Sequence, residues 1–575
     1  MRLRLVAVPA LIALLIGAAA APADARPRAA KRIQAFDSCE HLVGYASRHV
    51  PVPAPRMAPD APAAMPVPAE GDAGEDTSQT NVQEAGVDEP DTVKTDGRTI
   101  WTLAGGRLHA VDARAATPRL LSTLELEEGA GTTMLLRKDR ALLLGNGPLG
   151  TRITEVDVGD PSAPEILRTE DVDGHVVDAR MTGRSVRVVV SSYPYAALEP
   201  GVARDQPAGW LPARTVANRR TGHTQTRRVR CRAVRRPTQF SGPGVLTVYT
   251  VDLTRGLPAV DADAIFTSGD TVYASGANLY VATQRWNVDG ANTSIHRFDI
   301  SDPDRTTYAG SGAVPGSLLS QFSLSEHGGV LRAASTAGAG EGAESLVTTL
   351  APADGRLVQR GQVGGLGRGE RIYAVRFLGD VGYVVTFRQT DPLYTVDLSD
   401  PEQPRVRGEL KIPGYSAYLH PVGDDLLLGV GQEATDDGRV QGLQLSLFDV
   451  RDLAHPTRLH KLQLGARFSS SAVEWDHHAF LWWPATSLAV LPIESEPFSG
   501  AAGFRVSRAG IEAVGRIAHE GSTRSVVVGD RLFTLSELGV KVSALDGFGE
   551  RGRVAFPEPA EPPCCKPVPL PEPIP

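Results

Sequence analysis

The 575-residue sequence lacks the short motifs by which several large enzyme classes are recognised. It contains no G-x-S-x-G nucleophile elbow, no H-E-x-x-H metal-binding pair and no P-loop for nucleotide phosphates. The run GGLGRGE at positions 364–370 resembles a phosphate loop only superficially, and a turn between strands explains it better. These absences exclude the serine hydrolases, metalloproteases and nucleotide hydrolases that depend on those motifs.

Cysteine is scarce, with four residues in the whole chain. No C-x-x-C pair with matching histidines exists, which disfavours a zinc site built on cysteine. In an oxidising compartment four cysteines allow three disulfide connectivities. We favour Cys39 with Cys231, a bridge worth roughly 4 to 5 kcal/mol before strain is subtracted. The adjacent Cys564 and Cys565 are compatible with a vicinal disulfide or with an intermolecular bridge.

The chain has only a small excess of negative over positive charge, and aromatic residues are few. The net charge is −8 and 22% of the residues are charged, so nothing in the electrostatics favours nucleic acid or an anionic membrane as the main partner. Aromatic residues make up 6% of the chain, whereas there are 59 glycines and 43 prolines. This composition is typical of many short strands joined by tight turns.

The first 25 residues predict a secretion signal. Arg2 and Arg4 form a positive region, residues 5–21 are apolar, and Ala23-Asp24-Ala25 fits an A-x-A cleavage site. The alternative, an uncleaved membrane anchor, is disfavoured because the apolar run is short and contains Pro9. No later segment has the composition of a membrane span, so we expect a soluble protein that is secreted or periplasmic.

Residues 26–50 predict a short amphipathic helix. Its apolar positions fall on one helical face, and Asp37 with Glu40 can form a capping box. Residues 51–77 are rich in proline and alanine and predict an extended linker, so the helix should be tethered rather than embedded. Residues 557–575 form a proline-rich tail.

A nine-residue motif sets the period of the remaining chain. It reads VDLSDPEQP at Val396–Pro404, recurs as VDVGDPSAP at Val156–Pro164 and FDISDP at Phe298–Pro303, and appears more loosely elsewhere. The first aspartates of six copies are separated by 45, 95, 47, 98 and 52 residues. One doubled gap contains a degenerate extra unit, and the other contains an insertion at 193–244 without strand rhythm. These aspartates most simply cap turns; calcium binding is the alternative, but their spacing lacks the ligand density of an EF-hand.

Each unit contains four short runs of alternating apolar residues separated by turn residues. Four strands in a period of 40 to 50 residues predict an all-β fold, a β-propeller of eight or nine blades over residues 78–556. A series of β-sandwiches would not keep one turn motif in register, and a parallel β-helix would have a shorter period.

Residues Ser78–Gly97 read SQTNVQEAGVDEPDTVKTDG. This pattern resembles the start of the propeller in bacterial and archaeal secreted proteins with a C-terminal β-propeller domain, a family distantly similar to WD40 repeats. The resemblance continues through Trp210-Leu211-Pro212, Cys231, Asp476–Trp483 and Ser525–Val542, and upstream at Asp37–Leu42. It implies a secreted propeller without an assigned activity and transfers no catalytic residue.

Two clusters of polar residues are candidate metal sites. Asp88, Glu89 and Asp91 place three carboxylates within four positions and suit a cation such as calcium, although capping of turns is the simpler interpretation. The second cluster contains Glu474, Asp476 and His477, together with His478. Neighbouring residues of a strand point to opposite faces, so both histidines can bind one ion only if they lie in a turn. A polar turn without an ion is the alternative.

Residues 204–236 contain ten arginines and one acidic residue, Asp205. Such a patch would suit an acidic polymer of the cell envelope or a nucleic acid, whereas a disordered, solvated insertion is the simpler interpretation.

Our leading hypothesis is a secreted, non-catalytic propeller that binds a protein or polysaccharide at the cell envelope, with nucleic acid an unlikely partner. The second is a metal-dependent hydrolase with its ion in the central channel. The third is an anion-binding module that uses the arginine-rich insertion.

Overall fold

The computed structural model describes residues 35–50, 76–198, 205–237, 240–287, 290–388, 391–435 and 437–558. The expected signal peptide, nearly all of the linker, and the tail with Cys564 and Cys565 lie outside the described residues. Within these ranges, no helix is long and apolar enough to cross a membrane.

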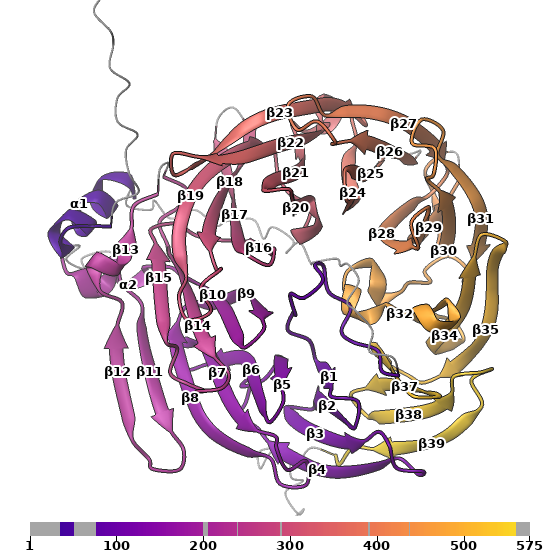
Figure 1. Cartoon of the computed structure of the whole chain (residues 1–575), viewed down its shortest axis with the longest axis horizontal. Coiled ribbons are helices and arrows are strands. Elements are labelled where there is room, and N and C mark those ends of the chain that lie inside the picture. Colours follow the sequence, from indigo (N-terminus) through magenta and orange to yellow (C-terminus); the bar gives the residue numbers. More distant parts are fainter. Residues whose placement is uncertain are drawn as a thin grey trace, which may run out of the picture.

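Most strands in the described part of the chain form nine antiparallel units of four, which follow one another around a ring (Figure 1). The prediction of a propeller with eight or nine blades is confirmed, and the number is nine. The weakly patterned stretch at 317–364 is the fifth blade. It joins the fourth in one eight-stranded sheet, because β19 and β23 pair in parallel at Ser311 and Arg356.

The blades comprise the following strands, each from the innermost to the outermost. Blade 1 has β1 (Val93–Thr95), β2 (Thr99–Ala104), β3 (Arg107–Asp112) and β4 (Arg119–Glu125); blade 2 has β5 (Thr133–Arg137), β6 (Arg140–Gly147), β7 (Gly150–Asp157) and β8 (Glu165–Asp173); blade 3 has β9 (His175–Thr182), β10 (Ser185–Ser192), β14 (Val245–Asp252) and β15 (Asp261–Ile265). Blade 4 has β16 (Thr271–Ala274), β17 (Asn278–Asn287), β18 (Gly290–Asp299) and β19 (Thr307–Pro315); blade 5 has β20 (Leu324–His327), β21 (Val330–Ala337), β22 (Glu344–Ala353) and β23 (Arg356–Leu366); blade 6 has β24 (Arg371–Leu378), β25 (Val381–Phe387), β26 (Asp391–Asp397) and β27 (Arg405–Ile412). Blade 7 has β28 (Tyr415–Val422), β29 (Leu426–Ala434), β30 (Val440–Asp449) and β31 (Thr457–Gln463); blade 8 has β32 (Leu481–Trp483), β33 (Leu488–Ser495), β34 (Phe498–Ser507) and β35 (Gly510–Ala518); blade 9 has β36 (Arg524–Val528), β37 (Arg531–Ser536), β38 (Gly539–Ala544) and β39 (Glu550–Ala555).

The hydrophobic core lies between adjacent blades. Leu142 and Ile153 of blade 2, for example, pack with Val188 and Tyr249 of blade 3. The repeated motif builds the turn between the two outer strands of a blade. Asp397 accepts hydrogen bonds from the backbone N–H and hydroxyl of Ser399, as expected of an aspartate that caps its own turn.

The ring is closed where the chain enters and leaves it. The backbone N–H of Ser78 donates to the carbonyl of Val527 in β36 over 2.9 Å, and Gly529 N–H donates to the carbonyl of Asp76 over 2.6 Å. Arg531 of blade 9 also donates to the carbonyl of Ala115 in blade 1 over 2.6 Å. Blade 9 is therefore joined through backbone groups to the residues that precede blade 1, and through the Arg531 side chain to blade 1 itself.

The alternation of strand direction sorts the connections onto two faces. In each blade the turn between the second and third strands and the link to the next blade leave from the same end. The insertion between β10 and β14 and the link between β31 and β32 therefore start from one face, which we call the link face.

The N-terminal helix α1 (Cys39–His49) packs against the insertion, which corrects the expectation that it is only tethered. Leu42 and Ala46 are fully buried beside Trp210 and Phe266. The predicted bridge is present: Cys39 is joined to Cys231 with their Cα atoms 5.1 Å apart. The predicted capping box at Asp37 is wrong, because Ser38 adopts the extended N-cap conformation and its hydroxyl accepts the His41 N–H.

The described part of the insertion is ordered into short elements rather than solvated coil. It contains α2 (Tyr195–Leu198), β11 (Ala213–Asn218), β12 (Thr224–Arg228) and β13 (Val234–Arg235). The β11–β12 hairpin extends the outer edge of blade 2 by pairing with β8, and β13 pairs in parallel with β15. The sequence concealed these strands because β12 is exposed along its whole length and lacks an apolar face.

Candidate functional site

Residues 76–92, which we call the axial segment, run through the centre of the ring before they enter β1 (Figure 1). The segment hydrogen-bonds to the innermost strands, or to the turns that precede them, of eight blades. The bonded residues are Lys94 of blade 1, Met134 of blade 2, Met181 of blade 3, Tyr273 of blade 4, Leu324 of blade 5, Tyr418 of blade 7, Phe480 of blade 8 and Val527 of blade 9.

A turn at Gly86 bends the axial segment back on itself. Gly86 has a φ of 77°, and the Val87 N–H donates to the Glu84 carbonyl over 3.1 Å. A Cβ at this position would meet nothing within 4 Å. Glycine is therefore favoured here because of the positive φ, and not because space is short. The turn delivers Glu89 to the axis of the ring.

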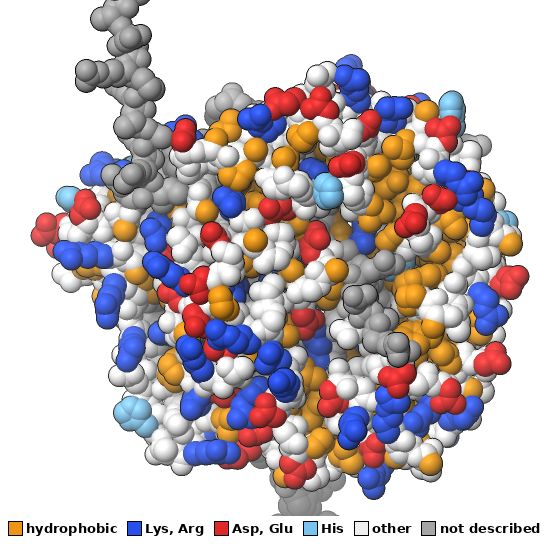
Figure 2. All heavy atoms as spheres, viewed as in Figure 1, with side chains coloured by type: hydrophobic (Ala, Val, Ile, Leu, Met, Phe, Trp, Pro, Cys, Tyr) orange, Lys and Arg blue, Asp and Glu red, His pale blue; other side chains and the backbone are white. Residues whose placement is uncertain are grey.

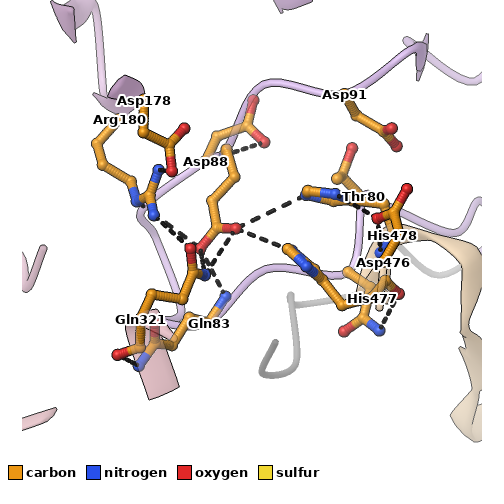
Figure 3. A network of polar contacts seen from close by, with 12 residues as sticks. Thr80, Gln83, Asp88, Asp91, Asp178, Arg180, Gln321, Asp476, His477 and His478 are labelled. Carbon is orange, nitrogen blue, oxygen red and sulfur yellow. Dashed lines mark hydrogen bonds and ion pairs between the residues drawn. The ribbon is translucent and has the colours of Figure 1, made fainter. Parts of the chain in front are cut away.

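Glu89 is the centre of a buried polar cluster (Figure 3). Its Oε1 accepts the backbone N–H of Gln83 over 3.0 Å, and the side-chain amide of Gln321 lies 3.1 Å from both carboxylate oxygens. Its Oε2 faces Nε2 of His477 at 3.0 Å and Nε2 of His478 at 3.6 Å. Arg180 of β9 completes the surroundings, with its Nε 3.8 Å from Oε1.

The two histidines lie in a short 3₁₀ turn, η6 (His477–Ala479), before β32. This is the arrangement in which both rings can face one point. Asp476 caps the turn by accepting the His478 N–H over 3.1 Å, and its Oδ1 also lies 3.3 Å from Nδ1 of the His478 ring. The ring centroids of His477 and His478 are 3.5 Å apart.

A second group of ion pairs borders the first. Arg524 of β36 bridges two carboxylates, with Nε 2.8 Å from Asp91 and Nη2 2.6 Å from Asp476. Lys94 of β1 lies 2.7 Å from Asp88. These contacts join the axial segment to blades 1, 8 and 9 through charge.

The surroundings shift the pKa values of Glu89 and His478 in the directions that favour ion pairing, and that of His477 in the opposite direction. Burial opposes ionisation of Glu89, but the charge of Arg180 and the two histidines hold the pKa of its carboxyl well below the usual range. Burial also opposes the charge on His478, but Asp91 and Asp476 outweigh it and raise its pKa to about 9. Burial and the neighbouring His478 lower the pKa of His477.

The structure brings together most residues that the sequence marked as candidates. Asp88, Glu89 and Asp91 meet Asp476 and His477 at the axis, although the two clusters stand about 390 residues apart in the chain. Glu474 lies apart from them, because it accepts the Ser471 N–H in a capping box and bonds the amide of Gln432.

Sequence reasoning missed the partners of these acids. Arg180, Gln321 and Arg524 belong to three other blades and carry no local motif. The only signal was that both acidic clusters precede the first strand of a blade. Because Asp88 and Asp91 are already paired with Lys94 and Arg524, they do not form the oxygen-rich shell that calcium requires.

Four arginines of the insertion form ion pairs with acidic residues of the propeller. Contacts of 2.6–3.0 Å join Arg214 to Glu170, Arg220 to Glu165 and Arg235 to Asp263, and Arg219 contacts Glu127. Figure 2 shows positive and negative side chains interspersed on the lower left of the visible face. Acidic neighbours thus balance part of the positive charge of the insertion.

An open groove lies on the link face where blades 7 and 8 meet. It has a volume of about 690 Å³ and is lined by residues 466–469 and 494–499. Phe468 is 85% exposed at a φ of 74°, and the Arg467 guanidinium stacks 4.9 Å from its ring centroid. Trp475 in the same link is 45% exposed. Figure 2 also shows hydrophobic side chains gathered on the right, over blades 6 to 8.

Comparison with known proteins gives a family and two partial relatives. The sequence model of the family described as "Beta propeller domain" matches residues 77–548. An uncharacterized protein of Methanocaldococcus jannaschii is 40% identical over 227 residues, which are 39% of this chain and 35% of that protein. An uncharacterized protein of Archaeoglobus fulgidus is 48% identical over 172 residues, which are 30% of this chain and 26% of that protein. The matches thus span about a third or less of the relatives' length.

Solved structures match the chain only at low similarity. Sqt1 of Saccharomyces cerevisiae matches with a TM-score of 0.38 at 11% identity and covers 79% of this chain and 100% of its own. The periplasmic gluconolactonase of Pseudomonas aeruginosa matches with a TM-score of 0.32 at 14% identity and covers 54% of this chain and 92% of its own. Similarity at this level carries no information about a ligand or a reaction.

Proposed function

The chain belongs to the beta propeller domain family, and from this premise we propose that it is a secreted, non-catalytic scaffold that binds a polysaccharide of the cell envelope in the groove between blades 7 and 8. The observation that carries the proposal is the axial segment, which occupies the place where many ring-shaped proteins take a ligand. Because the centre of the ring is filled, we expect a ligand to bind to the loops of the link face instead.

The polar groups at the axis are poorly placed for catalysis on a large substrate. Glu89 and His477 are 2% and 0% exposed, and Glu89 already contacts Gln83, Gln321 and both histidines. A hydrolase needs its reacting groups within hydrogen-bond distance of the substrate. A metal-dependent hydrolase at this position would require the axial segment to leave the ring, which its backbone pairing with β5, β9 and β36 opposes.

The groove offers the mixture of surfaces that a sugar chain requires. The exposed ring of Phe468 presents an apolar face to the C–H groups of a sugar ring, and Arg467, Glu496 and the nearby serine hydroxyls can bond its hydroxyl groups. The lining comes from two short segments, so it suits an extended chain better than a broad protein surface, which needs about 800 Å² per partner.

The test is binding of the purified chain to isolated envelope polysaccharides, measured by calorimetry or by co-sedimentation. We expect Phe468→Ala to weaken binding about three- to tenfold, since an aromatic contact is worth about 0.5–1.5 kcal/mol beyond the area it buries. Tyr195→Ala is the matched control, because Tyr195 is 73% exposed on the insertion, away from the groove.

Equal affinity of Phe468→Ala and the unaltered protein for the polysaccharide would refute the groove as the binding site. Release of reducing sugar ends during incubation would refute the non-catalytic role. Binding of envelope proteins without any binding of polysaccharides would identify a protein as the ligand and overturn the choice of a sugar chain.

A further inference from the structure

We propose that Glu89, His477 and His478 form a binding site for one divalent transition-metal ion, such as Zn²⁺, that fastens the axial segment to blade 8. Each of the three side chains offers one ligand atom, and these three atoms lie within 4.8 Å of one another. Two imidazoles and one carboxylate are a ligand set that zinc and its neighbours in the first transition row prefer.

The distances between the ligand atoms fit a common ion. Bonds of about 2.0–2.2 Å at tetrahedral or octahedral angles hold ligand atoms about 2.8–3.6 Å apart. The distances from Glu89 Oε2 to the two imidazole nitrogens are 3.0 and 3.6 Å. Small rotations of the rings would therefore bring all three atoms into one coordination sphere.

The groups behind the ligands hold them in the orientation that metal binding needs. Asp476 Oδ1 lies 3.3 Å from Nδ1 of His478, which leaves Nε2 of that ring directed at Glu89. This Nε2 is buried and has no hydrogen-bond partner among the described residues. Glu89 accepts the Gln83 N–H on Oε1 and contacts the Gln321 amide with both oxygens, and its Oε2 faces the two histidines. Carboxylates and amides behind the ligands are typical of metal sites.

The balance of charge around the site also favours a dication. Within the described residues of the cluster, five carboxylates face three permanent cations. The carboxylates are those of Asp88, Glu89, Asp91, Asp178 and Asp476, and the cations are Lys94, Arg180 and Arg524. Two negative charges thus remain when both histidines are neutral, and one divalent ion balances them. A buried charge without such a partner is costly.

The position of the ligands indicates a structural ion. Glu89 stands 388 residues before His477, so one ion would link the start of the propeller to its eighth blade. A cavity of about 20 Å³ borders His478 and leaves room for one water molecule beside the site, but for no substrate. The site is independent of the groove between blades 7 and 8.

The test uses the purified chain, stripped with a chelator and then titrated with Zn²⁺, Mn²⁺ or Ca²⁺. We expect one equivalent of Zn²⁺ after gel filtration, measured by elemental analysis, and a rise in unfolding temperature that Ca²⁺ does not produce. His478→Gln should weaken Zn²⁺ binding at least a hundredfold. His455→Gln is the matched control, since His455 forms an exposed pair with Asp452 at 2.9 Å and should bind as the unaltered chain does.

Stoichiometric Zn²⁺ in His478→Gln would place the ion elsewhere and overturn the proposal. A folded, unaltered chain that binds no Zn²⁺ would also overturn it and leave an ion-paired network only. If the variant does not fold, Co²⁺ in the unaltered chain decides: the absorption bands of a cobalt ion with nitrogen and oxygen ligands support the site, and the spectrum of aqueous cobalt refutes it.

Discussion

Arg524 provides the sharpest test of the charge network at the axis. Its guanidinium contacts Asp91 at 2.8 Å and Asp476 at 2.6 Å, and the side chains of Arg524 and Asp91 are 8% and 5% exposed. Replacing Arg524 with alanine leaves Asp91 buried without its main partner. Removing one member of a buried ion pair typically costs about 3–5 kcal/mol, because the remaining charge has lost both water and its counter-charge.

This loss translates into a measurable change in unfolding temperature. A propeller of roughly 470 residues unfolds with an entropy of about 1 kcal/mol per kelvin, at about 2.1 cal/mol/K per residue. Arg524→Ala should therefore lower the unfolding temperature by about 3–5 °C in a calorimetric scan. Replacing both partners, in Arg524→Met with Asp91→Asn, should recover part of that loss, because the buried charge on Asp91 is then gone as well.

The matched control is Arg439→Ala. Arg439 forms an equally short pair with Asp437 at 2.6 Å, but its side chain is fully exposed and water replaces the contact. We expect no measurable shift for this variant. If Arg524→Ala and Arg439→Ala shift the unfolding temperature equally, or if the double variant is less stable than Arg524→Ala, burial of the pair is not what makes it important.

Two further predictions concern other parts of the ring. His296 is buried in blade 4 with Nε2 3.0 Å from the Ser241 hydroxyl, and burial lowers its pKa to about 3. The fold holds this histidine neutral, whereas the unfolded chain takes up a proton below about pH 6.5. The free energy of unfolding is therefore unaffected above pH 6.5 and declines as the pH falls toward 3. The loss should reach about 2 kcal/mol by pH 5. Urea unfolding at pH 7.5 and pH 5 should show a smaller difference for His296→Gln than for the unaltered chain, and equal differences would contradict this assignment. Replacing Cys39 and Cys231 with serine removes a constraint worth about 5 kcal/mol on the chain-entropy model, but the bridge holds only α1 and the insertion. Limited proteolysis should then cut near α1 while the blades stay intact, and an unchanged digestion pattern would show that packing alone holds the helix.

Much of the architecture could be predicted because the repeated motif has a local cause. An aspartate such as Asp397 caps a turn using only neighbours in the chain, so the same residues produce the same turn in blade after blade. The Cys39–Cys231 bridge could be proposed because four cysteines allow few pairings. The packing of α1 could not be predicted from the sequence, because its apolar face does not indicate that Trp210 and Phe266 cover it.

The candidate site was harder to predict because it depends on contacts between distant parts of the chain. Asp88–Asp91 and Asp476–His478 could each be recognised as polar clusters, but each looked like a separate turn. Only closure of the ring places Glu89 against His477. The cations that neutralise the acids lie on strands, where Arg180 and Arg524 follow the ordinary alternation of side chains and carry no signal.

The axial segment also explains why polar residues can be concentrated at the centre of this ring. The innermost strand of every blade has one edge directed at the axis, and an unpaired edge leaves backbone N–H and carbonyl groups without partners. Residues of the axial segment pair with three of these edges, at Met134, Met181 and Val528. A segment that approaches strands so closely brings its own side chains into a buried space, where each carboxylate requires a counter-charge. The acidic motif and its scattered cations are therefore consequences of one structural requirement.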